Sequence, residues 1–372
     1  DGMSGEIFAY PYAQQGKFAN AEFILPPAGS LILFSSPSSV NKYQTKPQMA
    51  AGSPIKADSP LEIKRLQDNV LNIDFCNLII DGKPVKNTNQ DQNLYTVEAC
   101  ALLYKQFGMN NPWNSAIQYQ QTVVEKDTFK TGDIKVKYHF VIAGNMDKSK
   151  MRLVAEQPNI WKAKINGQSV MANPEDRWLD SRFGVYEIGK YVKTGENVVE
   201  LSVEPMSIYA EIAPVFILGD FSLESANMGW IMREPIDKFK LGSWKDQGQP
   251  YYSWDVSYSK NYTINDTDAR YALELKKWNG TVSEVYVNDS KVGVIAYKPY
   301  DFDLSPFLKK GNNKIEVRVI GSLRNLYGPH YSRDKGIAGP WHWNSVHRQD
   351  PGSDYSLFDY GLMEDFTVVS SK

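Results

Sequence analysis

Two distant stretches of this 372-residue chain carry the same sequence pattern, and this repeat limits the fold more than any other feature. A strand-like segment leads into Asn166-Gly167 in the first copy and into Asn288-Asp289 in the second. Each copy continues through a short turn to a Lys-x-Gly-x-Asn motif and another alternating segment. The aligned segments are 163–170 with 285–292, 186–201 with 302–317, and 218–223 with 363–368. Because the copies lie more than 100 residues apart, the repeat indicates domain duplication and not a solenoid.

Apolar residues alternate with polar ones in several segments, most clearly in 134–142, 198–203 and 314–319. A strand with one buried and one exposed face has this period of two. Turn residues such as Asp81-Gly82 separate these segments. Many short strands at short spacing favour sandwiches over a parallel α/β sheet. The sequence therefore predicts an all-β chain of tandem jelly-roll β-sandwiches.

One segment breaks the strand pattern and predicts a small helical insertion. Residues 95–107 have an apolar side, Thr96 is placed to cap the first turn, and Gly108 follows the last turn. We expect this helix to pack on a sheet edge. A shorter helical turn is predicted for residues 60–66.

The first 50 residues predict an incomplete unit, because a few short strands cannot bury a core of independent size. Three such strands are predicted, at 5–8, 21–25 and 31–34. We interpret residues 1–50 as the terminal strands of a sandwich that begins upstream, followed by a linker. Residues 51–228 then form a first sandwich that carries the helical insertion, and residues 229–372 form a second jelly roll.

Composition argues against several classes of function. A net charge of −2 gives no basic surface for nucleic acid or an anionic membrane. No apolar run approaches the roughly 20 residues of a membrane-spanning helix. The only cysteines, Cys76 and Cys100, are too few for a disulfide framework, and both a single bridge and two buried thiols stay open. The polar first four residues read as an internal cut and not as a signal peptide.

The second copy carries a recognisable motif in residues 285–293 and 300–319. A strand and turn are followed there by an aromatic residue, Asp-Leu, Gly-x-Asn and a further strand. This pattern resembles the sugar-binding jelly roll of glycoside hydrolase family 2 and its relatives, also called the galactose-binding-like domain, although Asn288-Asp289 replaces the more usual Asn-Gly. Residues 118–224 resemble the same fold more loosely. Three further segments are similar to the C-terminal region of large, rhamnosidase-like bacterial glycosidases: 5–7, 25–33 and 242–253.

The resemblance implies a non-catalytic accessory region of a secreted glycoside hydrolase that takes part in polysaccharide degradation. Its catalytic residues would lie outside this chain, in a (β/α)8 barrel upstream on the same polypeptide. The expected partners are that catalytic domain and a plant or host carbohydrate, with no nucleic acid and no membrane span. The expected location is secreted or periplasmic, in a bacterium. A free-standing pair of carbohydrate-binding modules and a complete small glycosidase, with its site between the sandwiches, are the alternatives.

The segment 339–344 is the best candidate for a carbohydrate-binding surface, because two tryptophans and a histidine lie in a Gly/Pro-rich loop. The candidate residues are Trp341, His342 and Trp343, with Tyr331 and Arg333 upstream. Stacking a sugar on one Trp would remove about 100 Å² of apolar surface from water, or roughly 2.5 kcal/mol. Millimolar binding needs about 4 kcal/mol in total, so one ring with one or two hydrogen bonds would support weak binding. Packing of this loop on the sheet end or on the upstream barrel is the alternative.

A second aromatic cluster favours core packing over a binding surface. It consists of Trp244, Tyr251, Tyr252 and Trp254.

Glycoside hydrolysis usually needs two carboxyl groups that flank the scissile bond. The sequence offers two candidate pairs, Asp301 with Asp303 and Asp176 with Asp180. Asp is common in turns and helix caps, so the structural interpretation is favoured for both pairs.

Three of the four histidines, His330, His342 and His347, lie near Asp334, Asp350 and Asp354 without the spacing of a zinc motif. No cofactor is expected beyond a structural calcium ion held by loop oxygens, which the fold permits and whose ligands the sequence does not place.

Overall fold

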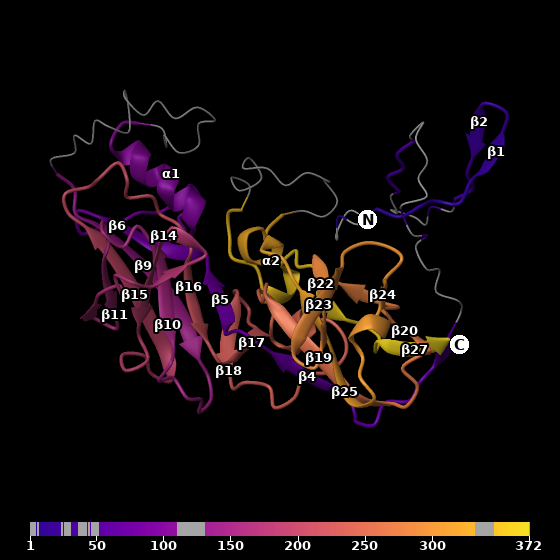
Figure 1. Ribbon diagram of the computed structural model, residues 1–372. Coiled ribbons are helices and arrows are strands. Elements are labelled where there is room, and N and C mark those ends of the chain that lie inside the picture. The colour runs from indigo at the N-terminus through magenta and orange to yellow at the C-terminus, as the bar shows by residue number, and fades with distance from the viewer. Residues whose placement is uncertain are drawn as a thin grey trace.

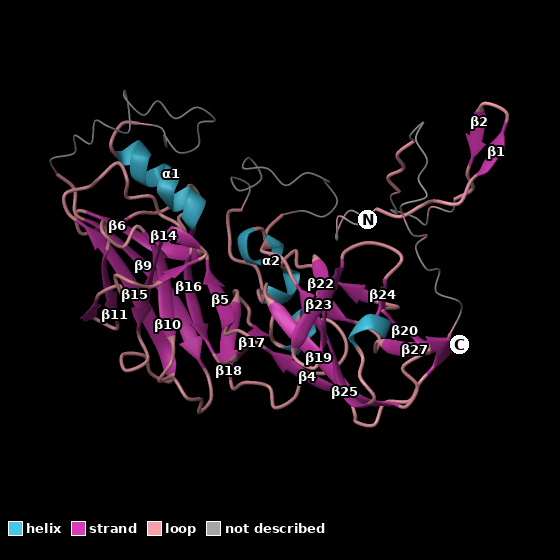
Figure 2. Ribbon diagram, in the orientation of Figure 1, coloured by secondary structure: helices cyan, strands magenta, loops and turns pink. Residues whose placement is uncertain are grey.

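The computed structural model describes residues 52–109, 131–331 and 346–371, together with 5, 7–23, 25, 31–35, 43 and 45. Figure 1 shows two β-rich bodies side by side, and strands dominate both of them in Figure 2. The α-helices of the described residues are α1 (Thr96–Gln106) and the single turn α2 (Arg324–Tyr327). Short 3₁₀ turns occur at η3 (Lys245–Gln247), η4 (Ser305–Phe307) and η7 (Gly352–Asp354). The predicted all-β class is confirmed.

The first sandwich is built from two antiparallel sheets. One has the order β13-β14-β10-β16-β5, and the other has the order β12-β11-β15-β9, with β6, β17 and β18 added around β9. The strands of the first sheet are β5 (Asn69–Ile73), β10 (Arg152–Glu156), β13 (Arg177–Trp178), β14 (Asp180–Glu187) and β16 (Val215–Gly219). Those of the second are β6 (Phe75–Ile80), β9 (Ile134–Ile142), β11 (Lys162–Ile165), β12 (Gln168–Val170), β15 (Gly195–Val203), β17 (Ser222–Ser225) and β18 (Trp230–Arg233). The short strands β7 (Lys83–Pro84) and β8 (Leu94–Tyr95) pair with β6.

The second sandwich also has two antiparallel sheets, with the orders β23-β22-β25-β19-β4 and β24-β20-β27-β3. The first of these contains β4 (Glu62–Arg65), β19 (Asp255–Ile264), β22 (Val282–Val287), β23 (Ser290–Ile295) and β25 (Gly311–Ile320). The other contains β3 (Ser53–Pro54), β20 (Arg270–Glu274), β24 (Asp301–Asp303) and β27 (Thr367–Ser371). A small separate pair joins β21 (Trp278–Asn279) to β26 (Gly361–Leu362).

The two sandwiches have the same strand topology. The order β6-β9-β15-β11-β12 corresponds to β4-β19-β25-β22-β23, and β5-β16-β10-β14 corresponds to β3-β27-β20-β24. Corresponding strands also follow one another in the same order along the chain. The repeated sequence segments therefore belong to two copies of one complete fold, as domain duplication predicts.

An asparagine pair holds the same turn in each copy, and we call this pair the asparagine clamp. The outer asparagine, Asn166 or Asn288, begins the hairpin turn with a φ of 49° or 51°, a conformation that Asn tolerates better than most residues. Its Nδ2 donates to Oδ1 of the inner asparagine, Asn197 at 2.8 Å or Asn313 at 3.0 Å. Each inner asparagine is fully buried and donates at 2.7 and 3.0 Å to two carbonyls of the Lys-x-Gly-x-Asn turn.

The first sandwich is inserted into the second. Strand β4 precedes the whole first sandwich in sequence, yet it pairs with β19, with Ile63 opposite Tyr258. Strand β3 likewise pairs with β27 near the C-terminal end. In Figure 1 the violet strand β4 lies within the orange second body. Our predicted division at residues 51 and 229 therefore needs correction, since β3 and β4 belong to the second sandwich and β18 belongs to the first.

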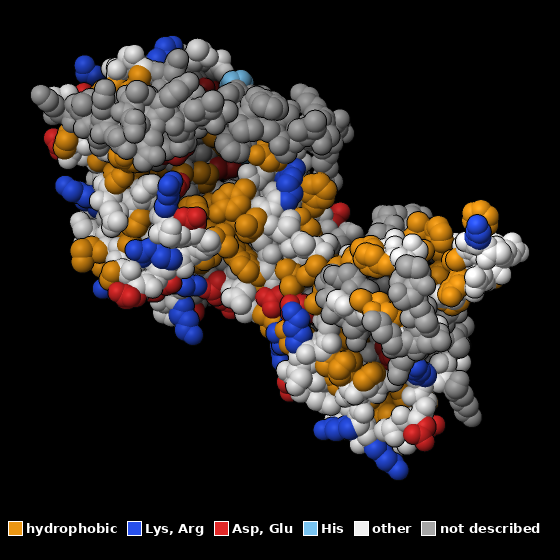
Figure 3. Space-filling model, turned by 45° about the horizontal axis from the view of Figure 1, so that its top comes forward, with side chains coloured by type: hydrophobic (Ala, Val, Ile, Leu, Met, Phe, Trp, Pro, Cys, Tyr) orange, Lys and Arg blue, Asp and Glu red, His pale blue; other side chains and the backbone are white. Residues whose placement is uncertain are grey.

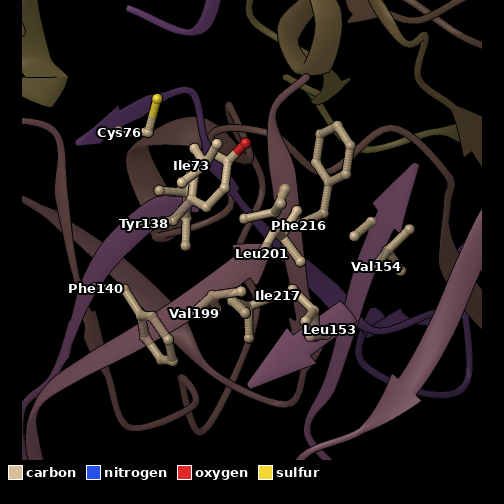
Figure 4. Packing of buried hydrophobic residues seen from close by; sticks show 14 of the residues in the cluster. Ile73, Cys76, Tyr138, Phe140, Leu153, Val154, Val199, Leu201, Phe216 and Ile217 are labelled. Carbon is tan, nitrogen blue, oxygen red and sulfur yellow. The ribbon is translucent and has the colours of Figure 1, made fainter. Parts of the chain in front are cut away.

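The apolar residues of the alternating segments are the ones that the structure buries. In β9 the buried residues are Ile134, Val136, Tyr138, Phe140 and Ile142, separated by more exposed ones. Figure 4 shows how side chains of the two sheets meet in the first core, with Tyr138, Phe140, Val199 and Leu201 from one sheet and Leu153 and Ile217 from the other. Val154 and Phe216 alternate with these residues along β10 and β16, so they lie on the opposite face of their sheet, where they are also buried. The second sandwich has its own core around residues such as Tyr258, Leu273 and Val317.

Helix α1 lies close to the predicted range, and it packs against β6. Tyr95 and not Thr96 is at the N-cap position, and the hydroxyl of Thr96 is buried without a hydrogen bond within the described residues. Gly108 follows the helix with a φ of +75°, which suits a helix end. Both Cys76 and Cys100 are buried, and neither forms a disulfide.

Two local predictions are wrong. The helical turn predicted for 60–66 is strand β4, because pairing with β19 overrides a weak local preference. Among the described residues before 52, the strands form a hairpin of β1 (Ala13–Gln15) and β2 (Phe18–Asn20), whereas residues 31–34 are not a strand. Phe34 is 84% exposed. Figure 3 also shows hydrophobic side chains on the surface of this N-terminal part of the chain. A short apolar run such as 31–34 does not make a strand without a neighbouring strand to pair with.

Candidate functional site

Four of the five residues predicted to bind carbohydrate lie outside the described residues: Arg333, Trp341, His342 and Trp343. The fifth, Tyr331, is half-buried, and the guanidinium of Arg324 lies 5.1 Å from the centre of its ring. Its backbone N–H donates to the carbonyl of Gly328 at 3.1 Å. Tyr331 thus packs within its own turn, and the tryptophan loop stays a prediction.

The segments on either side of this loop dock onto the first sandwich. They belong to the long connection between β25 and β26, and their described parts are residues 321–331 and 346–360. The side chains of Leu326, Tyr355 and Leu357 are buried in the core of the first sandwich. Nδ2 of Asn72 in β5 donates to the carbonyl of Leu326 at 2.8 Å. The connection therefore makes a buried joint between the two sandwiches.

A nearly buried charged pair lies in this joint. Nε2 of His330 lies 2.5 Å from Oδ2 of Asp74, and the two side chains are 11% and 3% exposed. Asp74 lies between β5 and β6 of the first sandwich, whereas His330 follows α2. The rings of Phe75, Tyr95 and Tyr355 surround the imidazole, with centroids 6.0, 5.3 and 4.6 Å from its own.

The charge state of His330 follows from two opposing effects. Burial lowers its pKa, but the negative charge of Asp74 and the hydrogen bond to it raise the pKa overall above its ordinary value. The pair is therefore an ion pair at mildly acidic pH. It cross-links the sandwiches, and its position inside the joint suits this structural role.

Polar contacts continue from the pair toward α1. The hydroxyl of Tyr355 forms a hydrogen bond with Gln349, and burial raises the pKa of that hydroxyl. Nδ2 of Asn93 donates to Oε1 of Gln349 at 3.1 Å. Within the described residues, no group of three or more His, Cys, Asp or Glu side chains is arranged to hold a metal ion. The structural calcium ion stays a prediction.

In each candidate carboxylate pair, one aspartate makes a local turn contact. Oδ1 of Asp303 accepts the backbone N–H of Ser305 at 2.9 Å, and its Oδ2 lies 3.1 Å from Nη1 of Arg270. Oδ1 of Asp180 accepts the backbone N–H of Arg182 at 2.8 Å. These are the turn contacts that the residue type favours.

A different pair of carboxyl groups was missed by sequence analysis. Burial raises the pKa of Glu211 to about 7, and the nearby charge of Glu156 adds to this effect while Arg182 opposes it. Burial also raises the pKa of Glu156, at the end of β10. The available signal was a single acidic residue within the otherwise apolar run 208–217. A carboxyl group protonated near neutrality has the chemistry of a general acid.

The raised pKa of Glu211 predicts a specific pH dependence. Folded Glu211 keeps a proton that the unfolded chain, with an ordinary pKa near 4.5, has already released. The free energy of unfolding should therefore fall as the pH rises from about 4.5 to about 7. We expect Glu211→Gln to flatten this decline, so that its melting temperature exceeds that of the unmodified chain at pH 8. Glu175→Gln, at an exposed position, is the matched control, and parallel pH curves for the unmodified chain and Glu211→Gln would contradict the assignment.

The second aromatic cluster is largely core. Trp244, Tyr251 and Tyr252 are each at most 1% exposed. The indole N–H of Trp244 donates to the hydroxyl of Tyr258 at 2.9 Å. Trp254 is half-buried at the edge of both cores. No helix in the described part of the chain is long and apolar enough to cross a membrane.

Comparison with known proteins finds limited similarity. No protein-family model matches the chain. A protein of Formosa agariphila named as a candidate β-glucuronidase is 24% identical over 174 residues, which cover 45% of this chain and 14% of that protein. A rhamnosidase from Novosphingobium sp. PP1Y aligns with 65% of this chain and 23% of its own, at 19% identity and a TM-score of 0.26.

Two further solved structures align over a similar share of the chain. A β-D-mannosidase from Dictyoglomus thermophilum covers 68% of this chain and 31% of its own, with 9% identity and a TM-score of 0.26. A β-glucuronidase from Bacteroides uniformis covers 68% and 28%, with 10% identity and a TM-score of 0.24. The chain thus spans less than a third of the length of each protein named, and similarity at this level carries no argument about its activity.

Proposed function

We propose that this chain is a non-catalytic accessory β-sandwich region of a secreted bacterial glycoside hydrolase, which braces the catalytic domain of the same polypeptide and contacts carbohydrate. The observation that carries the proposal is the joint between the two sandwiches. A sandwich inserted into its own duplicate, with Leu326, Tyr355 and Leu357 of the connection buried in its core and with the buried Asp74–His330 pair, has little freedom to rotate. A fixed orientation is what a brace beside a catalytic domain requires.

The state of the acidic residues also supports this proposal. Asp180 and Asp303 make hydrogen bonds within their own turns. This structural role accounts for both residues without a catalytic pair of carboxyl groups. Glu156 and Glu211 are the residues that would favour the alternative of a small complete glycosidase, because their pKa values are raised by burial. The decisive experiment therefore compares glycoside hydrolysis by the isolated chain with hydrolysis by its Glu211 variant.

We expect the purified chain alone to hydrolyse none of the 4-nitrophenyl glycosides of β-glucuronic acid, α-rhamnose, β-mannose and β-galactose. The longer polypeptide encoded by the same gene should hydrolyse at least one of them. Removing this region from that polypeptide should shorten its activity half-life on heating, because the catalytic domain loses its support. Turnover by the chain alone that Glu211→Gln abolishes would contradict the accessory function and favour a small glycosidase.

A further inference from the structure

The second sandwich carries a cleft of about 360 Å³ beside the small β21–β26 pair. Its walls combine aromatic rings with small and polar residues: Trp278, Asn279, Gly280, Ala296, Tyr300, Phe358, Asp359 and Tyr360. They come from three separate parts of the chain, around β21, from the link between β23 and β24, and from the stretch before β26. The volume is at the lower end of the range for small-molecule sites.

Two aromatic rings form one corner of the cleft. The rings of Trp278 and Tyr300 pack edge to face, with centroids 5.3 Å apart and planes at 73°. Each ring is half-buried, so part of it stays accessible. The indole Nε1 of Trp278 is buried and has no hydrogen-bond partner among the described residues. Because this nitrogen is closed to solvent, a bound molecule would contact the accessible part of the two rings and not the indole N–H.

Polar groups of the same cleft are held in place by neighbours. The carboxylate of Asp359 lies 2.9 Å from Nζ of Lys245, and 44% of the side chain remains exposed. The hydroxyl of Tyr360 lies 2.6 Å from Oγ of Ser322. The Asn279 side chain is exposed at the rim. The cleft therefore offers oriented oxygen acceptors and an amide beside aromatic rings.

We infer that this cleft binds a neutral saccharide, as one or two sugar units of a polysaccharide chain. A sugar ring has an apolar C–H face that packs on aromatic rings, and a rim of hydroxyl groups that pair with carboxylates and amides. Asp359 is already paired with Lys245, and the described lining residues include no Lys or Arg that could bind the carboxylate of an acidic sugar. The inference deepens the proposed contact with carbohydrate and rests on that function, but it assigns the contact to residues other than Trp341 and its neighbours.

Affinity electrophoresis tests this inference with four soluble probes: galactomannan, xyloglucan, arabinan and the acidic polygalacturonan. We expect at least one neutral polysaccharide to retard the chain, whereas polygalacturonan does not. Tyr300→Ala should raise the dissociation constant at least tenfold. Ala296→Leu, which fills the cleft without removing a ring, should raise it by a similar factor. Tyr297→Ala is the matched control, because Tyr297 is 41% exposed and lies outside the lining.

Each outcome bears on the cleft separately from the accessory function. Absence of retardation on all four polysaccharides would overturn the inference. So would binding that Tyr300→Ala and Ala296→Leu leave unchanged while Trp341→Ala removes it, since the tryptophan loop would then be the site. Equal unfolding midpoints for Ala296→Leu and the unmodified chain show that lost binding is not lost folding. Glycoside turnover by the chain, in contrast, would contradict only the accessory function.

Discussion

Replacing Asp74 with alanine is expected to lower the free energy of unfolding by about 3–5 kcal/mol, because it leaves the enclosed imidazolium of His330 without its counter-charge. The Asp74 side chain is 3% exposed, so water cannot take the place of the carboxylate without opening the joint. Urea unfolding followed by tryptophan fluorescence measures the change. Glu224→Ala removes an exposed ion pair with Arg233 and is the control, for which little change is expected.

The same variant should show a pH signature. The pKa of His330 is raised in the folded chain, so the stability from this pair is fully present below the ordinary pKa of 6.5 and is lost as the pH rises through the raised value. The difference between the unmodified chain and Asp74→Ala should therefore narrow between pH 6 and pH 9. A difference that is below about 1 kcal/mol at pH 6, the range of exposed pairs, would contradict a buried ion pair in the joint.

Replacing Asn313 with alanine is expected to cost about 3 kcal/mol, since it removes a fully buried side chain that makes four hydrogen bonds. The loss leaves two carbonyls, the backbone N–H of Lys309 and the side-chain amide of Asn288 without these partners in the turn. Urea unfolding again measures the effect. Asn312→Ala changes the exposed neighbour and should have little effect.

The duplicated fold provides a second check on this prediction. Asn197→Ala removes the equivalent contacts from the first sandwich, so its cost should match that of Asn313→Ala to within about 1 kcal/mol, given the spread of such values. A large cost in one copy and a small one in the other would show that the asparagine clamp is not the shared stabilising feature of the repeat.

Local patterns in the sequence predicted much of the fold correctly. The alternation in 134–142 matches the buried and exposed faces of β9, and the helix expected at 95–107 is α1. Asn166 and Asn288 were recognised as turn residues of a repeat, and both start equivalent hairpins. These features depend on residues a few positions apart, so the chain reveals them without its tertiary structure.

The residues of the candidate functional sites were less predictable from the sequence than the fold. The predicted tryptophan loop is outside the described residues, whereas Asp74, Glu211 and Trp278 were not singled out. Asp74 is a single aspartate between two strands, and its partner His330 is 256 positions away. Nothing in the spacing of such residues predicts that they meet.

The sequence by itself determined the local features of this protein: its strand-forming segments, their turns, and the presence of two copies of one sandwich. Only the tertiary structure decided that one sandwich is inserted into the other, and that Asp74 meets His330 in the joint. The physical reason is the range of the interactions. Strand and turn preferences act between neighbours along the chain, whereas the pairing of β4 with β19 and the burial of a charged pair depend on contacts that form only when distant segments pack together.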